Sequence, residues 1–238
     1  MLKIEHLTKT YGDKKAVDDL SLHVEGGEIF GFIGHNGAGK TTTIKAVCGI
    51  LDFDCGEIIL DGISIKENPL LCKSRLAYIP DNPDLYDYMT GRGFIDFVCD
   101  VFSVTESERE VRIATYAQGF GLEKELSQPI ATYSHGMKQK LAIISALVHE
   151  PRLIVMDEPF VGLDPVASHY LKQEMRALCA RGASIFFSTH VLEVAEKLCD
   201  KVAIIKEGRL VIAGDMASVR GDSSLESVFL ELAEDSEA

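Results

Sequence analysis

The chain lacks any apolar run of membrane-spanning length. Leu141 to Val148 is among its longest apolar stretches, far below the roughly 20 residues that a spanning helix needs. No charged and then apolar signal segment opens the sequence. We therefore expect any membrane work to depend on a separate partner.

Cysteine pairs of the kind that bind metals are missing as well. The chain has six cysteines and no C-x-x-C motif, so cysteine-based metal ligation is not expected. Buried, reduced thiols in the cytosol are the default interpretation. The six are Cys48, Cys55, Cys72, Cys99, Cys179 and Cys199.

Positive charge is scarce. Lysine and arginine number 24 against 37 acidic residues, the net charge is -13, and no Lys/Arg run occurs. This balance argues against a nucleic-acid partner, since phosphate backbones attract clustered cations. The chain has 238 residues, 46% of them hydrophobic, enough for one large α/β domain or a core with a subdomain.

A glycine-rich stretch fits the pattern G-x-x-x-x-G-K-[ST] at every required position. It follows the apolar run 29–33, predicted as a buried strand, and precedes a helical spacing of apolar residues. Glycines let backbone N–H groups point at an anion, and the helix N-terminus adds partial positive charge. The stretch is Gly34, His35, Asn36, Gly37, Ala38, Gly39, Lys40, Thr41 and Thr42.

This context predicts a nucleoside triphosphate site. Lys40 would reach the β- and γ-phosphates, and the Thr41 hydroxyl would bind Mg²⁺. The alternative, a chance glycine turn, leaves the strand, the helix, the lysine and the threonine unexplained.

The N-terminal part is predicted as an antiparallel edge attached to a parallel core. Strands are expected at 2–7 and 16–24 around a Gly12-Asp13 turn, and a hairpin around Asp61-Gly62. Further strands are expected at 76–79, 153–157 and 184–188, and a hairpin at 202–213.

Between about Thr90 and Val148 the periodicity is helical, and we interpret this part as an insertion. Phe94, Phe97, Val98 and Val101 share one predicted helix face. The predicted division is a nucleotide-binding core at 1–80 and 151–215, a helical subdomain at 81–150, and a short helix with an acidic tail at 216–238.

Polar residues follow the ends of several buried strands. The carboxyl ends of parallel strands share one edge, so Asp81, Asp157, Glu158 and His190 should meet the phosphate loop there. Asp157 suits Mg²⁺ through water, Glu158 can polarise an attacking water, and His190 can contact the γ-phosphate. The alternatives are a solvated loop start for the acidic pair and a structural role for the histidine.

Tyr133-Ser134-His135-Gly136-Met137 precedes a predicted helix. Ser134 and Gly136 can offer a hydroxyl and an N–H to a phosphate, although Ser-x-Gly before a helix is more often a cap. The segment lies within the helical insertion, so a phosphate contact would have to be made in trans, across a dimer.

Over nearly its whole length the chain resembles the ATP-binding subunit of an ABC transporter. The glycine loop matches the family's Walker A motif, and Leu153 to Glu158 matches Walker B with the catalytic glutamate. Further matches are Tyr11 for the aromatic that stacks on adenine, Ser134 to Met137 for the signature, Asp164 for the D-loop and His190 for the switch histidine. The end of the chain and Tyr78 to Tyr86 are similar to prokaryotic exporter-type subunits, including those of Ecs-like systems.

The resemblance implies a P-loop, RecA-like α/β core and an ATPase that uses Mg²⁺. Two subunits, identical or sister, would pair head to tail, with Ser134 and Gly136 holding the partner's γ-phosphate and Asp164 linking the two sites. A separate integral membrane permease would convert hydrolysis into transport. The subunit would then be cytoplasmic and peripheral on the inner face of the membrane, with 81–97 as the expected docking surface.

Three positions depart from the family pattern. Asp81 stands where a glutamine usually follows the strand and adds a negative charge near the expected metal. His135 replaces a glycine, and Met137 replaces a glutamine. Protonation of His135 would make the trans contact sensitive to pH.

Two other functions remain as alternatives. A soluble ABC-type ATPase of translation or repair usually carries two ATP-binding domains or a long coiled-coil insertion, and this chain has neither. A GTPase or kinase switch leaves the signature unexplained, and the sequence has no N-K-x-D guanine motif.

Overall fold

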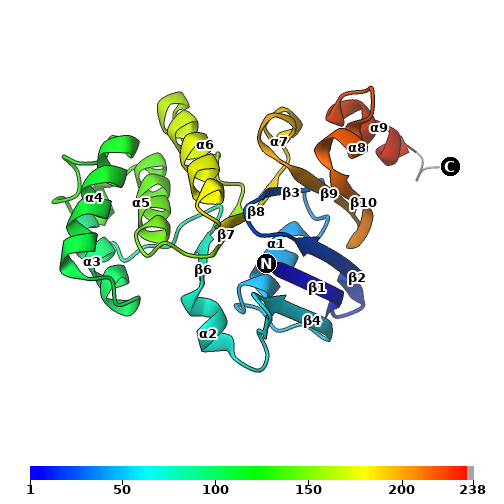
Figure 1. Cartoon of the computed structure of the whole chain (residues 1–238), viewed down its shortest axis with the longest axis horizontal. Coiled ribbons are helices and arrows are strands. Elements are labelled where there is room, and N and C mark those ends of the chain that lie inside the picture. The colour runs from blue at the N-terminus through cyan, green and yellow to red at the C-terminus, as the bar shows by residue number, and fades with distance from the viewer. Residues whose placement is uncertain (235–238) are drawn as a thin grey trace.

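The computed structural model describes residues 1–234 and consists of two sheets with helices around them (Figure 1). A larger sheet runs through the middle. A smaller antiparallel sheet lies beside it, and three helices form the opposite end of the molecule (Figure 1). The long helix α6 (Pro165–Ala180) lies between that helical end and the rest.

The larger sheet has the strand order β10-β9-β3-β8-β7-β6. Its strands from β9 to β6 are parallel, and only β10 runs antiparallel. Every residue of β3 and β7 is buried, as expected of apolar strands covered on both faces. The bounds are β3 Ile29–Ile33, β6 Leu76–Ile79, β7 Leu153–Asp157, β8 Ser184–Thr189, β9 Lys201–Lys206 and β10 Arg209–Asp215.

The smaller sheet has the order β2-β1-β4-β5 and is antiparallel throughout. The predicted turns lie where the sequence indicated them: Tyr11 pairs with Lys14 across Gly12-Asp13, and Leu60 pairs with Ile63 across Asp61-Gly62. The first two strands are longer than expected. The bounds are β1 Leu2–Tyr11, β2 Lys14–Val24, β4 Cys55–Leu60 and β5 Ile63–Ser64.

Successive side chains along the parallel strands point to opposite faces of the sheet, and this divides the core into two layers. Ile154 and Met156 of β7 face the cluster that includes the helical end, whereas Leu153 and Val155 face the smaller sheet. Helix α1 (Lys40–Val47) packs into this second layer through Ile44 and Val47. The helix that follows the phosphate loop is therefore held between the two sheets.

The helical end consists of α3 (Gly91–Val101), α4 (Glu106–Phe120) and α5 (His135–Leu147) (Figure 1). A capping box begins α4, with Thr105 N donating to Glu108. The predicted apolar face of α3 is only partly buried, with Phe97 45% exposed and Val101 exposed. Ile95 and Cys99 make the buried face instead. The division into domains stays a prediction.

Short helices complete the described chain. Helices α2 (Pro69–Ser74) and α7 (Leu192–Leu198) were not predicted from the sequence and are only about two turns long. Near the C-terminus α8 (Met216–Arg220) precedes α9 (Leu225–Glu234), in the region where a short helix was predicted. The end of the predicted acidic tail, 235–238, lies outside the described residues.

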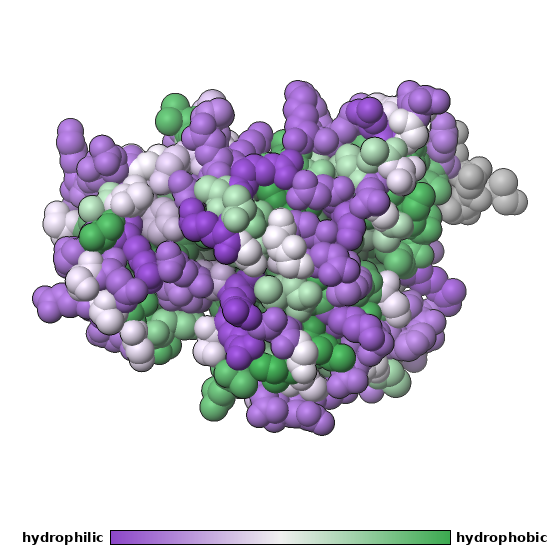
Figure 2. Space-filling model, in the orientation of Figure 1, coloured by the Kyte–Doolittle hydropathy of each residue, from purple (hydrophilic) through white to green (hydrophobic). Residues whose placement is uncertain are grey.

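Hydrophilic residues cover most of the molecular face seen in Figure 2, in keeping with the high charge of the chain. Five of the six cysteines are buried as expected, but Cys55 at the start of β4 is exposed, so that prediction was wrong for one thiol. Among residues 1–234, no helix combines the length and the apolar character needed to cross a membrane.

His149, just after α5, makes stability depend on pH. Its ring stacks on Phe102 with centroids 3.7 Å apart, and burial, with the nearby Arg112 charge, lowers the pKa of His149 to about 4. The ordinary pKa of a histidine is 6.5, so below this pH His149 binds a proton in the unfolded chain but not in the folded chain. Stability is therefore lost as the pH falls from about 6.5 towards 4.

We expect His149→Phe to remove this loss, because phenylalanine keeps the stack and cannot be protonated. Between pH 7.5 and 5.0, the unfolding free energy from urea titration should fall by about 2 kcal/mol less in the variant than in wild type. Exposed His169 provides the control. The unfolding free energy of His169→Phe should fall by the same amount as that of wild type. An equal fall in all three proteins would contradict the assignment.

Candidate functional site

A cleft of about 370 Å³ opens at the carboxyl edge of the parallel strands. The loop after β3, the start of α1 and the ends of β6 and β7 all reach it. The structure thus brings most of the sequence-predicted site residues together. Its lining residues are Tyr11, Lys14, Ala16, Asn36, Gly37, Gly39, Lys40, Thr41, Thr42, Asp81, Asp157 and Glu158.

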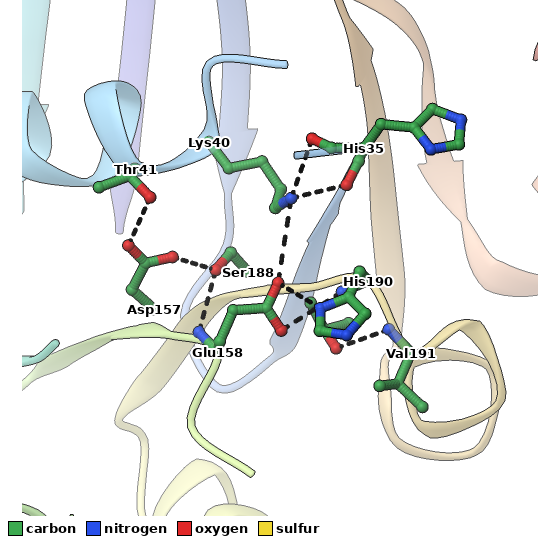
Figure 3. A network of polar contacts seen from close by, with 10 residues as sticks. His35, Lys40, Thr41, Asp157, Glu158, Ser188, His190 and Val191 are labelled. Atoms are coloured by element: carbon green, nitrogen blue, oxygen red, sulfur yellow. Dashed lines mark hydrogen bonds and ion pairs between the residues drawn. The ribbon is translucent and has the colours of Figure 1, made fainter. Parts of the chain in front are cut away.

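Lys40 is the cation of this cleft. Its Nζ donates to Gly34 O at 2.6 Å and to His35 O at 3.3 Å, and lies 3.9 Å from Glu158 Oε1 (Figure 3). The side chain is 7% exposed. Burial lowers the pKa of Lys40, while the carboxylates of Glu158 and Asp157 act in the opposite direction. A buried ammonium held by carbonyls has a strong preference for an arriving anion.

The loop around Lys40 needs glycine where its backbone passes close to β2. Gly39 has φ +109°, and a Cβ at this position would lie 2.4 Å from Ala16 O. The turn after β9 supports the same loop, because Gly208 N donates to Ala38 O at 2.9 Å. The phosphate loop is therefore fixed from its outer side.

Asp157 ends β7 and joins the loop through hydroxyl groups (Figure 3). Thr41 Oγ1 donates to Asp157 Oδ2 at 2.7 Å, and Ser188 Oγ donates to Asp157 Oδ1 at 2.5 Å. Ser188 was not predicted as a site residue. Its signal was a hydroxyl directly after the apolar run 185–187, but only the β7–β8 register pairs it with Asp157.

Glu158 lies between the lysine and the histidine. Its N donates to Ser188 Oγ at 3.1 Å, and its backbone has φ +48°, in the left-handed region. His190 Nδ1 lies 2.9 Å from Glu158 Oε1, and His190 N donates to Oε2 at 3.4 Å (Figure 3). Within residues 1–234, Oε1 is buried without a well-aligned hydrogen-bond donor. This oxygen can therefore accept a hydrogen bond.

The two ends of the cleft differ in character. Half-exposed Tyr11 and neighbouring Lys14, which the sequence analysis did not select, line the end near β1 and β2. Asp81, after β6, lines the cleft together with Asp157 and Glu158. An aromatic side chain thus lies at one end and carboxylates at the other.

The ring of His35 does not line the cleft. It points away from Lys40 (Figure 3) and lies against Phe229 of α9, with ring centroids 4.6 Å apart. Its backbone carbonyl still accepts from Lys40 and from Ala38 N. Gly34 and Ala38 are buried behind the cleft.

The predicted signature forms the start of α5. Ser134 is its N-cap, with Oγ accepting from Met137 N at 3.3 Å. His135 lies over Gly162: a Cβ there would come 2.7 Å from His135 Cδ2, and φ is +80°. Together with Gly136, these residues lie outside the lining of this chain's own cleft. The structure thus leaves open the trans contact that the sequence predicted.

Asp164 joins the signature helix to α6 within one chain. Its carboxylate accepts from Val166 N and Ala167 N and lies 2.6 Å from Lys140 Nζ. The Lys140 ammonium and the helix N–H groups hold the pKa of Asp164 below its usual value. Like the signature, it does not line the cleft.

A glycine loop between a buried strand and a helix, a buried lysine and paired carboxylates at the edge of a parallel sheet define a P-loop nucleoside triphosphatase. The family model described as ABC transporter matches residues 17–161. The chain belongs to the ABC transporter family, as an ATP-binding and ATP-hydrolysing subunit.

Two curated relatives and one solved structure are similar over most of their lengths. The ABC-type transporter ATP-binding protein EcsA of Bacillus subtilis (strain 168) is 35% identical over 98% of this chain and 96% of its own. The Nod factor export ATP-binding protein I of Paraburkholderia xenovorans (strain LB400) is 36% identical over 90% of this chain and 70% of that protein. A structure described as the ATP-binding subunit of an ABC transporter has a TM-score of 0.94 at 36% identity, covering 98% and 99% of the two chains.

Lys40→Ala should weaken ATP binding at least about 100-fold, because a charge-assisted contact to phosphate is lost from a buried position. Fluorescent ATP analogue titration measures the change. Lys45→Ala is the matched control, since Lys45 lies exposed in the last turn of the same helix. Unchanged binding by the Lys40 variant would remove this residue from the site.

Proposed function

We propose that this chain powers transport through a separate membrane permease, by closing with a second ATP-binding subunit around two ATP molecules. The observation that carries the proposal is the convergence of Lys40, Asp157 and Glu158 on one cleft, with His190 in contact with Glu158 and the signature outside the cleft. The family membership supports the same function.

The different ends of the cleft suit the different parts of ATP. The phosphates would occupy the loop, where Lys40 exchanges its carbonyl contacts for β- and γ-phosphate oxygens. The base would lie towards Tyr11, on whose exposed ring it can stack. This arrangement places the γ-phosphate next to Asp157 and Glu158.

The oxygen donors around Asp157 fit Mg²⁺. Thr41 and Asp157 provide a hydroxyl and a carboxylate, which are hard ligands, and Asp81 can contribute through water. Within residues 1–234, no three His, Cys, Asp or Glu side chains gather as a complete metal site. That agrees with an ion that takes further ligands from phosphates and water. When bound, Mg²⁺ would neutralise charge on the β- and γ-phosphate oxygens.

Glu158 is our candidate for the catalytic base. Its buried Oε1 would accept the proton of a water that attacks the γ-phosphorus, while the β–γ bridging oxygen leaves with ADP. Contact with His190 fixes the carboxylate, and Ser188 Oγ fixes the backbone of the same residue by accepting from Glu158 N. His190 is half-exposed, so it can also approach the γ-phosphate.

The second subunit would supply the signature contact, because the signature of one chain does not line that chain's own cleft. Ser134 and His135 are exposed at the tip of α5, and Gly136 offers a helix-terminal N–H there. Packing of His135 on Gly162 and the Lys140–Asp164 pair join this tip to the segment that follows Glu158. A head-to-tail pair, of identical or sister subunits, would place the tip on the partner's γ-phosphate.

Glu158→Gln should keep ATP binding but slow hydrolysis at least about 100-fold, because a positioned base is lost. Phosphate release measures the rate, and light scattering should detect an accumulating ATP-bound dimer. The control is Glu193→Gln, on the surface of α7. Wild-type hydrolysis by the Glu158 variant would rule out this residue as the base.

A groove between the parallel sheet and the helical end is our candidate for docking the permease. It measures about 300 Å³ and is lined by Pro83, Leu85 and His149 among others. Next to it lies an aromatic patch made of Tyr86, Tyr88, Phe94 and Phe97. The ring of Tyr86 contacts the other three rings at centroid distances of 5.8 to 6.2 Å.

Exposure of this aromatic patch supports docking. Tyr88 is 84% exposed and Phe97 45%. Clustered exposed aromatics are typical of interaction surfaces, and buried aromatics often dominate binding energy. The patch lies within the segment expected from the sequence. A cytoplasmic helix or loop of the permease would cover it and hold this subunit at the inner membrane face.

The double variant Tyr88→Ala, Phe97→Ala should reduce the amount of co-purifying membrane protein at least about tenfold, since hot-spot aromatics are removed. The measurement is affinity capture of the tagged chain from detergent-solubilised membranes, with mass spectrometry. Exposed Val111 on α4 provides the control variant Val111→Ala. Full recovery of the membrane protein with the double variant would exclude this patch.

Export is the direction that we favour. One relative is named for Nod factor export, and the sequence resembles exporter-type subunits. The alternative, a soluble ATPase of translation or repair, is not supported by the relatives, which are named as transporter or export subunits.

A further inference from the structure

We propose that Phe229 of the C-terminal helix α9 is a positioning residue for the phosphate loop and strengthens ATP binding through His35. This inference rests on the nucleotide site proposed above and adds a residue outside its cleft. The rings of His35 and Phe229 lie 4.6 Å apart between centroids, inclined by 52°. No other aromatic contact of the phosphate loop occurs in the described part of the chain.

Helix α9 is anchored independently of His35. Leu225, at its first position, is fully buried, and its N donates to Glu196 Oε2 at 2.9 Å. Arg220 of α8 donates to Glu196 Oε1, also at 2.9 Å. Glu196 belongs to α7, which begins two residues after His190. The helix is therefore fixed to the core, so that Phe229 presents a stable surface to the loop.

The contact is made on the outer side of the phosphate loop. His35, Ile204, Ile205 and Phe229 surround a narrow space there, between the loop, β9 and α9. Apolar area is also visible at this end of the molecule, near β10 and the C-terminal helices (Figure 2). The ring of Phe229 therefore contacts the loop without reaching the phosphates.

Holding His35 fixes the backbone that receives ATP. The His35 carbonyl accepts from Ala38 N at 3.1 Å and from Lys40 Nζ at 3.3 Å. A change at this residue therefore alters both the path of the loop and the position of its lysine. Binding is stronger when the loop is already ordered, because less conformational entropy is then lost on association. An aromatic contact that restrains the residue would act in this way.

The first test is Phe229→Ala. We expect the Kd for ATP and the KM to rise about three- to tenfold, the range of one aromatic pair, with kcat retained. Leu230→Ala is the matched control, because Leu230 is the next residue of α9 and is 53% exposed. The control should bind ATP as wild type does.

A double-mutant cycle separates positioning from general destabilisation. His35→Ala and Phe229→Ala should each weaken ATP binding, and the double variant should be no weaker than the worse single variant. Phe229→Tyr retains the ring and should restore binding. Additive losses, or wild-type affinity in Phe229→Ala, would overturn the inference while leaving the nucleotide site intact. Failure of the wild-type chain to bind ATP would instead overturn the proposed function together with this inference.

Discussion

A buried ammonium group at the edge of a parallel sheet governs the organisation of this molecule. Lys40 is almost without solvent, and a cation in that position costs free energy unless oxygen atoms surround it. Two loop carbonyls and the carboxylate of Glu158 provide them in the structure described here. The Glu158 carboxylate is 3.9 Å from the ammonium, at the long end of an ion pair. A phosphate oxygen in direct contact would be a stronger partner.

Strand order explains why these groups meet. Strand β3 delivers the glycine loop, β7 delivers Asp157 and Glu158, and β8 lies between them and delivers Ser188 and His190. Ser188 pairs in register with Asp157, so a hydroxyl from the middle strand bridges the outer two. The site therefore depends on the register of a sheet in which β3 precedes both β7 and β8 by more than a hundred residues.

Three features outside the cleft bear on the proposed assembly: the start of α5, the aromatic patch and α9. The start of α5 lies outside the cleft and packs against Gly162, so this segment does not reach the phosphate loop of its own chain. The aromatic patch on the helical end is exposed where an isolated domain would be expected to bury it. At the other end, α9 lies against the back of the phosphate loop. Under the proposed function, the first two features would contact other subunits, whereas the third is a contact within the chain itself.

The sequence by itself determined the local parts of this protein. Residues 29–42 specify strand, glycine loop and helix through short-range spacing, and β7 is recognisable from four consecutive aliphatic residues before Asp157. The turns at Gly12-Asp13 and Asp61-Gly62 were equally predictable, since turn geometry depends on neighbouring residues. Family resemblance added the expected roles, which spacing alone could not supply.

Only the tertiary structure decided which distant groups touch. The register of the strands places Ser188 in contact with Asp157. The ring of His35 packs against Phe229 behind the loop and does not line the cleft. The exposed side of α3 could not be distinguished from its buried side by periodicity, since both carry apolar residues. These outcomes depend on packing between segments far apart in the chain, and a local pattern of residue types contains no information about such distances.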